Sequence, residues 1–366
     1  MSALEAAAPE ERGETLTFSQ RLSLPSFLGL SLKNGLLNLV TLTLYRFWGK
    51  TEVRRRVWGA TYLNDEPFEY TGRGVELFLG FLFALGVVGL PFLLLSFGAQ
   101  LLDPALFALL ILPMYLFMFF LFGFGIFSAF RYMASRTTWR GVRFQLIGSG
   151  KEYGLHYIGY AFLGGMTFGW YMPTAQRKLA EPLWAGLRFG DRRFRFLMWS
   201  AEEQGIYGPY AIGWFGTIVA YGLFVAAVAF AGPAFGFGSE GSAEMSLGQI
   251  VFMYAGLAML MLVLAVVYAP YQAALLRSIT AGIRFEDVRF SMKVRWWETA
   301  SLTITNLLLL GVSLGFLMPY VQARTAKFLI SRLRADGVVD LDDVRQTRRG
   351  PRTGEGLADA FGVGAI

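Results

Sequence analysis

Residues 105–130 read ALFALLILPMYLFMFFLFGFGIFSAF, a stretch that holds no Asp, Glu, Lys or Arg. The apolar core of a bilayer is about 30 Å thick, and an α-helix needs about 20 apolar residues to cross it. Three other stretches, 77–97, 206–239 and 245–276, are equally free of charge and long enough to cross. Together they predict four long transmembrane helices.

The overall composition agrees with a lipid environment. Of the 366 residues, 55% are hydrophobic and 16% are charged, and the mean hydropathy is +0.46. A soluble protein of this size could not bury that much apolar surface. The first residues include no apolar run typical of a cleavable signal peptide, so we expect the internal helices to direct insertion.

The residue types exclude several kinds of chemistry. The chain has no cysteine and a single histidine, His156, which rules out disulfides, thiolate sites and multi-histidine metal sites. It also lacks a phosphate-binding loop and an HExxH motif. We therefore expect no enzymatic activity and no cofactor. Although the net charge is +7, its placement indicates the lipid bilayer as partner and no nucleic acid.

The basic residues avoid the connectors of the predicted helix pairs. None of the 33 Lys and Arg residues lies in 99–104 or 232–246. Because Lys and Arg are retained on the cytoplasmic side during insertion, both connectors should face outward and every basic segment inward.

Three shorter apolar segments, 22–45, 153–176 and 299–323, complicate this topology. If each crossed once, basic clusters such as the one around Arg192 and Arg193 would be forced outside. We therefore interpret the segments as re-entrant, entering and leaving on the cytoplasmic side. A topology with seven single spans stays open, because the charge bias is a tendency and not a law.

These three segments also resemble one another. Aligned without gaps, TLTLYRFW at 41–48, TFGWYMPT at 167–174 and SLGFLMPY at 313–320 begin with a hydroxyl residue. Pro173 and Pro319 coincide as well. The similarity predicts an internally duplicated bundle, and in transporters such repeats often surround the binding site.

A second pattern recurs between the apolar segments. Residues 60–70, 140–148, 185–196 and 281–292 alternate apolar with polar or basic side chains and include a Phe. Alternation around a short turn, such as the Asn-Asp pair of the first copy, is typical of β-hairpins. Four copies predict a small cytoplasmic sheet.

The predicted fold class is an all-α polytopic membrane protein with four long helices, three related membrane segments and short cytoplasmic β-hairpins. Its predicted organisation is a disordered tail (1–17), a first membrane repeat (18–152), a second (153–295), a third partial repeat with an amphipathic end (296–344) and a disordered basic tail (345–366).

Within residues 34–70, the run NLVTLTLYRFWGKTEVRRRVWGATYLNDEPFEY resembles the YjgN-like bacterial inner-membrane proteins, a family of unknown function. The resemblance implies a location in the bacterial cytoplasmic membrane and no known activity. This chain departs from the family pattern with Thr43 in place of Gly and Phe47 in place of Pro. We therefore expect its first copy to be less sharply bent than the other two. The residues that carry the resemblance are Asn38, Thr41, Leu42, Tyr45, Trp48, Arg54, Arg55, Arg56, Pro67, Phe68, Glu69 and Tyr70.

Polar side chains within the apolar segments are candidate ligand-binding positions. A polar group at membrane depth is costly unless it has a partner, so it marks either a binding cavity or a contact between helices. Interfacial anchoring and helix contacts are the commoner uses. The candidates are Lys33, Asn34, Asn38, His156, Gln176, Asn306 and Gln322.

A dense basic patch beside the first segment consists of Lys50, Arg54, Arg55 and Arg56. Each such charge attracts anionic phospholipid headgroups by about 1 kcal/mol. The same residues also serve to fix the topology, and the two roles are compatible.

Two classes of function remain open. The first is a pore or permease for a small solute, and the alternative is a non-transporting membrane scaffold or lipid-associated envelope protein. A continuous polar cavity lined by Asn34, Gln176 and Asn306 would favour the first, whereas a packed aromatic interior would favour the second.

Overall fold

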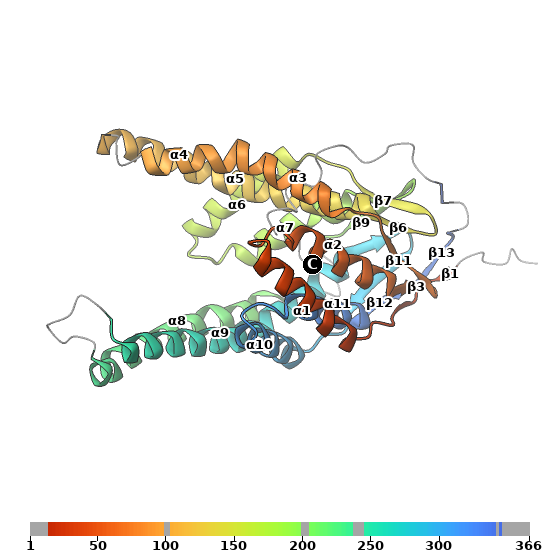
Figure 1. Ribbon diagram of the computed structural model, residues 1–366. Helices are drawn as coiled ribbons and strands as arrows, with labels where there is room; N and C mark the ends of the chain where they lie inside the picture. Colours follow the sequence, from red (N-terminus) through yellow and green to blue (C-terminus); the bar gives the residue numbers. More distant parts are fainter. Residues whose placement is uncertain (1–13, 99–102, 199–204, 237–244, 342–343, 346–366) are drawn as a thin grey trace, which may run out of the picture.

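The computed structural model describes residues 14–98, 103–198, 205–236, 245–341 and 344–345. Helical hairpins extend from one end of a curved antiparallel sheet. The two longest of them run in the same direction away from it (Figure 1). The predicted all-α class is therefore wrong, since the chain also builds an extensive sheet.

In the first long hairpin, the consecutive helical segments α3 (Gly74–Ala84), η1 (Leu85–Gly89) and α4 (Leu90–Gly98) are followed by α5 (Pro104–Arg136). Segment η1 is a π-helical turn, so the predicted span 77–97 is not one uninterrupted α-helix. The next residue but one, proline 91, has no N–H to donate, which favours such an irregular turn.

The second long hairpin is regular. It joins α8 (Tyr207–Ala231), followed by the short 3₁₀ turn η2 (Gly232–Phe235), to α9 (Leu247–Gly282). Ser246 begins α9 with a capping box, in which its hydroxyl accepts from the N–H of Gln249 while the Gln249 side chain accepts from the Ser246 N–H.

Three helical stretches are long and apolar enough to cross a membrane: Leu109–Arg136, Tyr207–Phe235 and Leu247–Gly282. Only 11% of the most apolar part of each is buried, and Phe230 is 88% exposed. Water-soluble proteins rarely expose continuous apolar surfaces of this extent, so the chain is a membrane protein.

Each of the three shorter predicted segments is the first helix and turn of a helical hairpin. The chain reverses at 41–45, 167–171 and 313–317 and returns as a second helix that contacts the first. The pairs are α1 (Pro25–Val40) with α2 (Arg46–Gly59), α6 (Gly150–Met166) with α7 (Met172–Ala185), and α10 (Trp296–Val312) with α11 (Met318–Arg332).

All the strands of the main sheet pair with their neighbours in chain order, from β5 to β12. Strands β2, β3 and β4 form a second sheet that continues into the first, because the N–H of Phe68, between β4 and β5, donates to the carbonyl of Thr61 (3.0 Å). The last strand of the main sheet, β12, lies beside β2, so the strands curve round almost into a barrel. Their bounds are β2 (Phe18–Gln20), β3 (Thr61–Leu63), β4 (Glu66–Pro67), β5 (Glu69–Tyr70), β6 (Thr137–Trp139), β7 (Val142–Leu146), β8 (Leu187–Phe189), β9 (Arg192–Phe196), β10 (Ile283–Phe285), β11 (Val288–Met292) and β12 (Leu333–Asp336).

The four predicted hairpins contribute strands of these sheets. An isolated hairpin leaves unpaired edges, and pairing the copies edge to edge satisfies them. The second hairpin begins earlier than predicted, because its turn is Arg140–Gly141, with φ of 48° and 72°. Successive strands are connected alternately by helical hairpins and by tight turns. The connections follow the order short hairpin, turn, long hairpin, turn.

Two short strands near the ends of the described chain pair with each other. Strand β1 (Glu14–Thr15) pairs with β13 (Val338–Val339), and Leu16 is buried, so the predicted disordered N-terminal tail is wrong for residues 14–17. The predicted amphipathic end holds strands. Of the predicted basic tail, the structure describes Arg345, whose N–H donates to Asp191 (3.3 Å). Residues 1–13 and 346–366 of the two predicted tails lie outside the described residues.

Candidate functional site

The three short hairpins turn by means of the same side-chain contact. In the first, the Thr41 hydroxyl donates to the Leu37 carbonyl (2.6 Å) and accepts from the N–H of Tyr45 (3.0 Å). Thr167 repeats both contacts in the second hairpin, and in the third the hydroxyl of Ser313 accepts from the N–H of Leu317, the residue before the next helix. One hydroxyl thus joins the end of one helix to the start of the next.

The backbone of the three turns is also equivalent. Two consecutive residues have left-handed φ values in each copy, and the second is Thr43 (70°), Gly169 (90°) or Gly315 (84°). The expected weaker bend of the first copy is therefore wrong. Its turn closes because the N–H of Thr43 donates to the carbonyl of Asn38 (2.6 Å), as in a Schellman motif.

The second helices of these hairpins bury equivalent positions. Phe47, Pro173 and Pro319 occupy the first such position, and the pattern continues two, four and seven residues later in all three copies. At the last of these, small residues occupy two copies and Arg54 the first. Helices α2, α7 and α11 therefore turn corresponding faces toward the interior.

A cavity of 420 Å³ lies between these helices, the end of α5 and the sheet. Its lining is almost wholly apolar and includes Trp58 from α2, Phe130 from α5, Trp184 from α7 and Ile330 from α11. Phe144 of β7 closes it on the sheet side. The cavity thus lies where the helical hairpins meet the sheet.

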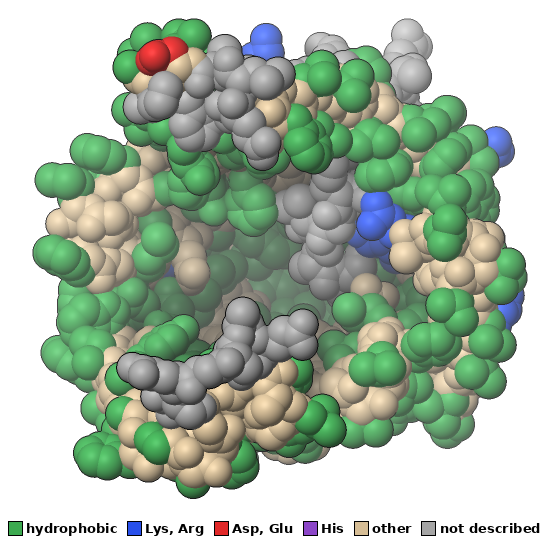
Figure 2. Space-filling view, turned by 60° about the vertical axis from the view of Figure 1, so that its left-hand side comes forward, with side chains coloured by type: hydrophobic (Ala, Val, Ile, Leu, Met, Phe, Trp, Pro, Cys, Tyr) green, Lys and Arg blue, Asp and Glu red, His purple; other side chains and the backbone are tan. Residues whose placement is uncertain are grey.

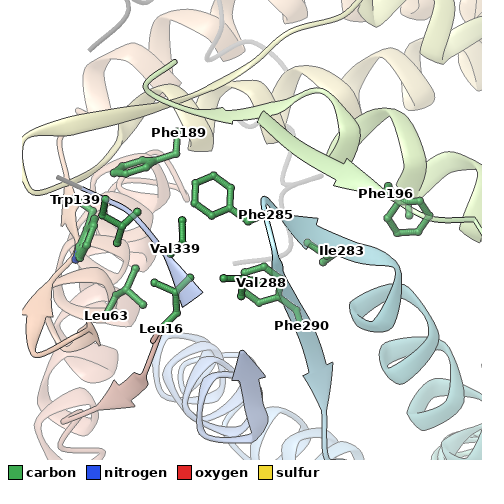
Figure 3. Close-up of a cluster of buried hydrophobic side chains, with 12 residues drawn as sticks. Leu16, Leu63, Trp139, Phe189, Phe196, Ile283, Phe285, Val288, Phe290 and Val339 are labelled. Atoms are coloured by element: carbon green, nitrogen blue, oxygen red, sulfur yellow. The ribbon is translucent and has the colours of Figure 1, made fainter. Parts of the chain in front are cut away.

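A second apolar cavity, of 450 Å³, lies inside the curved sheet and is lined by residues of the strands and of α7, α9 and α11. It shares Phe68, Phe144, Trp184 and Leu187 with the first cavity, so the two adjoin. Figure 3 shows the core beside it, where Trp139 and other buried side chains gather around a common interior.

Aromatic rings pack closely in this interior. The ring centroids of Phe194 and Phe285 are 4.5 Å apart, and those of Phe144 and Phe189 are 4.8 Å apart. A packed aromatic interior was the feature expected of a lipid-associated or scaffold protein, and here it surrounds open apolar space.

The candidate polar residues of the first hairpin have local roles. Lys33 forms a partly exposed ion pair with Glu52, with 2.9 Å between Nζ and Oε2, which raises the Lys33 pKa. Asn34 is buried against Gly49 of α2, and among the described atoms the Oδ1 oxygens of Asn34 and Asn38 have no hydrogen-bond partner.

The remaining candidates lie in other helix pairs. His156 is exposed and stacks on Tyr160, with ring centroids 6.0 Å apart. Gln176 accepts a hydrogen bond from the hydroxyl of Tyr271 (2.6 Å). Asn306 accepts from Arg324 (3.1 Å) and donates to Thr325 (3.2 Å). Gln322 is half-buried on α11.

The structure therefore does not bring Asn34, Gln176 and Asn306 together. Each is engaged in a different helix pair, and the two cavities where the hairpins meet the sheet have apolar linings. These amides serve as contacts between helices, the commoner use of such groups.

The basic patch divides into buried and surface residues. Arg54 is fully buried, with Nη1 3.3 Å from the hydroxyl of Tyr70, so its predicted contact with headgroups is wrong. Arg55 and Arg56 are exposed, and Lys50 is half-buried. Arg54 lies in the interior because it stands on the face of α2 that is turned toward the sheet.

Sequence reasoning missed the cavity residues, above all Trp184, which lines both cavities. A signal was present, since Phe68 and Phe194 recur at the spacing of the repeat. Recurrent Phe at inward strand positions indicates a shared apolar interior.

Comparison with known proteins gives one match. Residues 17–360 match the model of a family described as a bacterial protein of unknown function, DUF898, which is the family of the YjgN-like proteins. The predicted resemblance is confirmed. No curated protein and no solved structure matches the chain.

Proposed function

Because the chain belongs to the bacterial family DUF898, whose function is unknown, we propose its function from its architecture: it binds the acyl chain of a membrane lipid. The observation that carries this proposal is the pair of adjoining apolar cavities where the hairpins meet the sheet. Of the two classes considered, it is thus the lipid-associated one.

The cavity lining selects for apolar ligands. Each methylene group removed from water stabilises binding by about 0.8 kcal/mol. Burying a polar group that has no hydrogen-bond partner costs several kcal/mol. Trp58, Phe130 and Trp184 offer rings and Met133 a flexible thioether. The volumes of 420 and 450 Å³ fall within the range of roughly 300–1,000 Å³ typical of ligand pockets.

The proposed setting is the bacterial cytoplasmic membrane. Four spans cross it, with α3, η1 and α4 together forming the fourth, and the three short hairpins enter and leave on the sheet side. The alternation of short and long hairpins supports an internal duplication. The basic residues of the strands and their turns support a cytoplasmic position of the sheet.

The proposed entry route runs between the helical arms. Viewed toward the free ends of the long hairpins, the molecule is hollowed at its centre, and hydrophobic side chains line much of the hollow, with Lys or Arg at its right-hand side (Figure 2). The hydrophobic part of the rim offers an acyl chain an apolar path from the bilayer into the hollow.

Photolabelling tests the proposal. The protein in vesicles is labelled with a phospholipid that carries a diazirine at the end of one acyl chain, and adducts are mapped by mass spectrometry. We expect adducts on the cavity residues Phe144 and Trp184. Adducts confined to the outward faces of α5, α8 and α9 would sink the idea.

Matched variants sharpen this test. Ala134→Leu fills the first cavity and should reduce its labelling several-fold, whereas Ala229→Leu, on the exposed face of α8, should leave it unchanged. Met133→Ala enlarges the cavity and should preserve labelling, which separates filling of the cavity from overpacking.

A further inference from the structure

A separate pocket of 460 Å³ opens between α10 and α11, on the third short hairpin. Unlike the cavities above, its lining combines apolar with charged side chains and includes Arg324, Lys327 and Arg332 from α11. The hydroxyl residues Ser301 and Ser331 lie at the same pocket.

The pocket carries an excess of positive charge. Its only acidic lining residue within the described chain, Glu298, accepts from Arg332 at 2.8 Å, and this hydrogen bond lowers the Glu298 pKa. Arg324 donates to neutral groups, Thr305 and Asn306, at 2.6 and 3.1 Å. The charge of Arg324 is therefore not balanced by that carboxylate.

Lys327 is the second cation left with neutral partners. Its Nζ donates to the backbone carbonyl of Leu22 at 3.3 Å, although an ammonium group can donate three hydrogen bonds. Lys327 is half-buried, so its donors are held at the pocket and not spread through solvent.

Two tryptophans indicate the level in the membrane at which this pocket lies. Trp296 and Trp297 begin α10 with about half of each side chain exposed, 47% and 50%. Arg295 lies over the ring of Trp297, with 5.1 Å between its guanidinium carbon and the ring centroid. Exposed indoles beside cations are typical of the level of the lipid headgroups, and Trp297 itself lines the pocket.

We propose that this pocket binds the phosphate group of an anionic phospholipid. Arg324 offers a planar fork of donors and Lys327 a compact charge, the two kinds of side chain that hold phosphate oxygens. Ser301 can donate to a remaining oxygen, whereas the hydroxyl of Ser331 donates to the carbonyl of Phe328 (3.1 Å). The site is distinct from the acyl-chain cavities and does not depend on the function proposed for them.

The test compares lipid retention by native mass spectrometry. Protein is equilibrated with mixed micelles that contain phosphatidylglycerol or the zwitterionic phosphatidylcholine, and bound lipid is counted. We expect tighter retention of phosphatidylglycerol. The double variant Arg324→Gln with Lys327→Gln should lose roughly 25-fold in affinity, or about five-fold per charge.

Matched controls keep the result specific. Lys151→Gln with Arg334→Gln removes two exposed cations elsewhere and should leave retention unchanged. Equal losses in both double variants would mean unspecific attraction and would overturn the proposal. Lys327→Gln alone removes one hydrogen bond to a carbonyl and should lose about five-fold while the protein stays folded.

Inorganic phosphate distinguishes a lipid site from a site for a soluble anion. Added in excess over the lipid, it should displace little phosphatidylglycerol, because a free anion lacks the lipid's anchorage in the bilayer. If phosphate alone binds as tightly and displaces the lipid, the pocket serves a soluble anion and the proposal is overturned.

Discussion

At the scale of single residues, Thr43 shows how the fold imposes a backbone conformation against the preference of a side chain. Its φ of 70° lies in the left-handed region, where the other two copies have glycine. A β-branched residue pays about 1–2 kcal/mol there. The hydrogen bonds of Thr41 and Asn38 hold the turn despite this cost.

Replacing Thr43 by Gly should therefore stabilise the protein. We expect the free energy of unfolding to rise by about 1 kcal/mol, because the exposed Thr43 side chain contributes little packing. Denaturant titration in detergent measures it. The converse change, Gly315→Thr, should lower it by a similar amount, and a destabilised Thr43→Gly would show that the threonine side chain has a role of its own.

At the scale of elements, α8 supports the turn between α6 and α7. The Tyr210 hydroxyl donates to the carbonyl of Gly169 (2.7 Å), and the indole N–H of Trp214 donates to that of Phe168 (2.8 Å). Turn carbonyls in an apolar environment need such partners. A long hairpin thus satisfies the polar backbone of a short one.

Tyr210→Phe should loosen this turn. Leaving the carbonyl of Gly169 unsatisfied costs about 1–3 kcal/mol, since Tyr210 is buried. Hydrogen exchange of residues 164–172 should accelerate. Tyr221→Phe, on the exposed side of the same helix, serves as the control, and equal exchange in both variants would contradict the supporting role.

Local signals in the sequence predicted individual elements better than their assembly. The repeated hydroxyl of Thr41, Thr167 and Ser313 marked the three turns, because a turn depends on residues close in the chain. The position of β12 beside β2 and the burial of Arg54 depend on distant segments, which local patterns do not record. The cavities escaped prediction for the same reason.

At the scale of the whole molecule, the two long hairpins extend from the same end of the sheet (Figure 1). The free ends of both hairpins therefore lie away from the sheet, and the proposed cytoplasmic sheet implies that these ends face outward. Successive strands stay on the same side of the membrane only if the chain between them crosses it an even number of times. A helical hairpin, which returns to the side it left, meets this condition.

Enzyme fusions test that orientation. Alkaline phosphatase joined after Phe235, at the free end of α8, should be active, because it folds only outside the cytoplasm. A fusion at Arg193, in β9, should be inactive. Activity at Arg193 would mean that segment 153–176 crosses the membrane and that the topology is alternating.

The closure of the sheet also sets an order of events during synthesis. Strand β2 emerges from the ribosome early, whereas its neighbour β12 begins only at Leu333. The membrane hairpins must therefore insert while one edge of the sheet is still open. Contacts so distant in the chain form slowly, so a ribosome-bound chain that ends before Leu333 is expected to expose its apolar interior to chaperones and proteases.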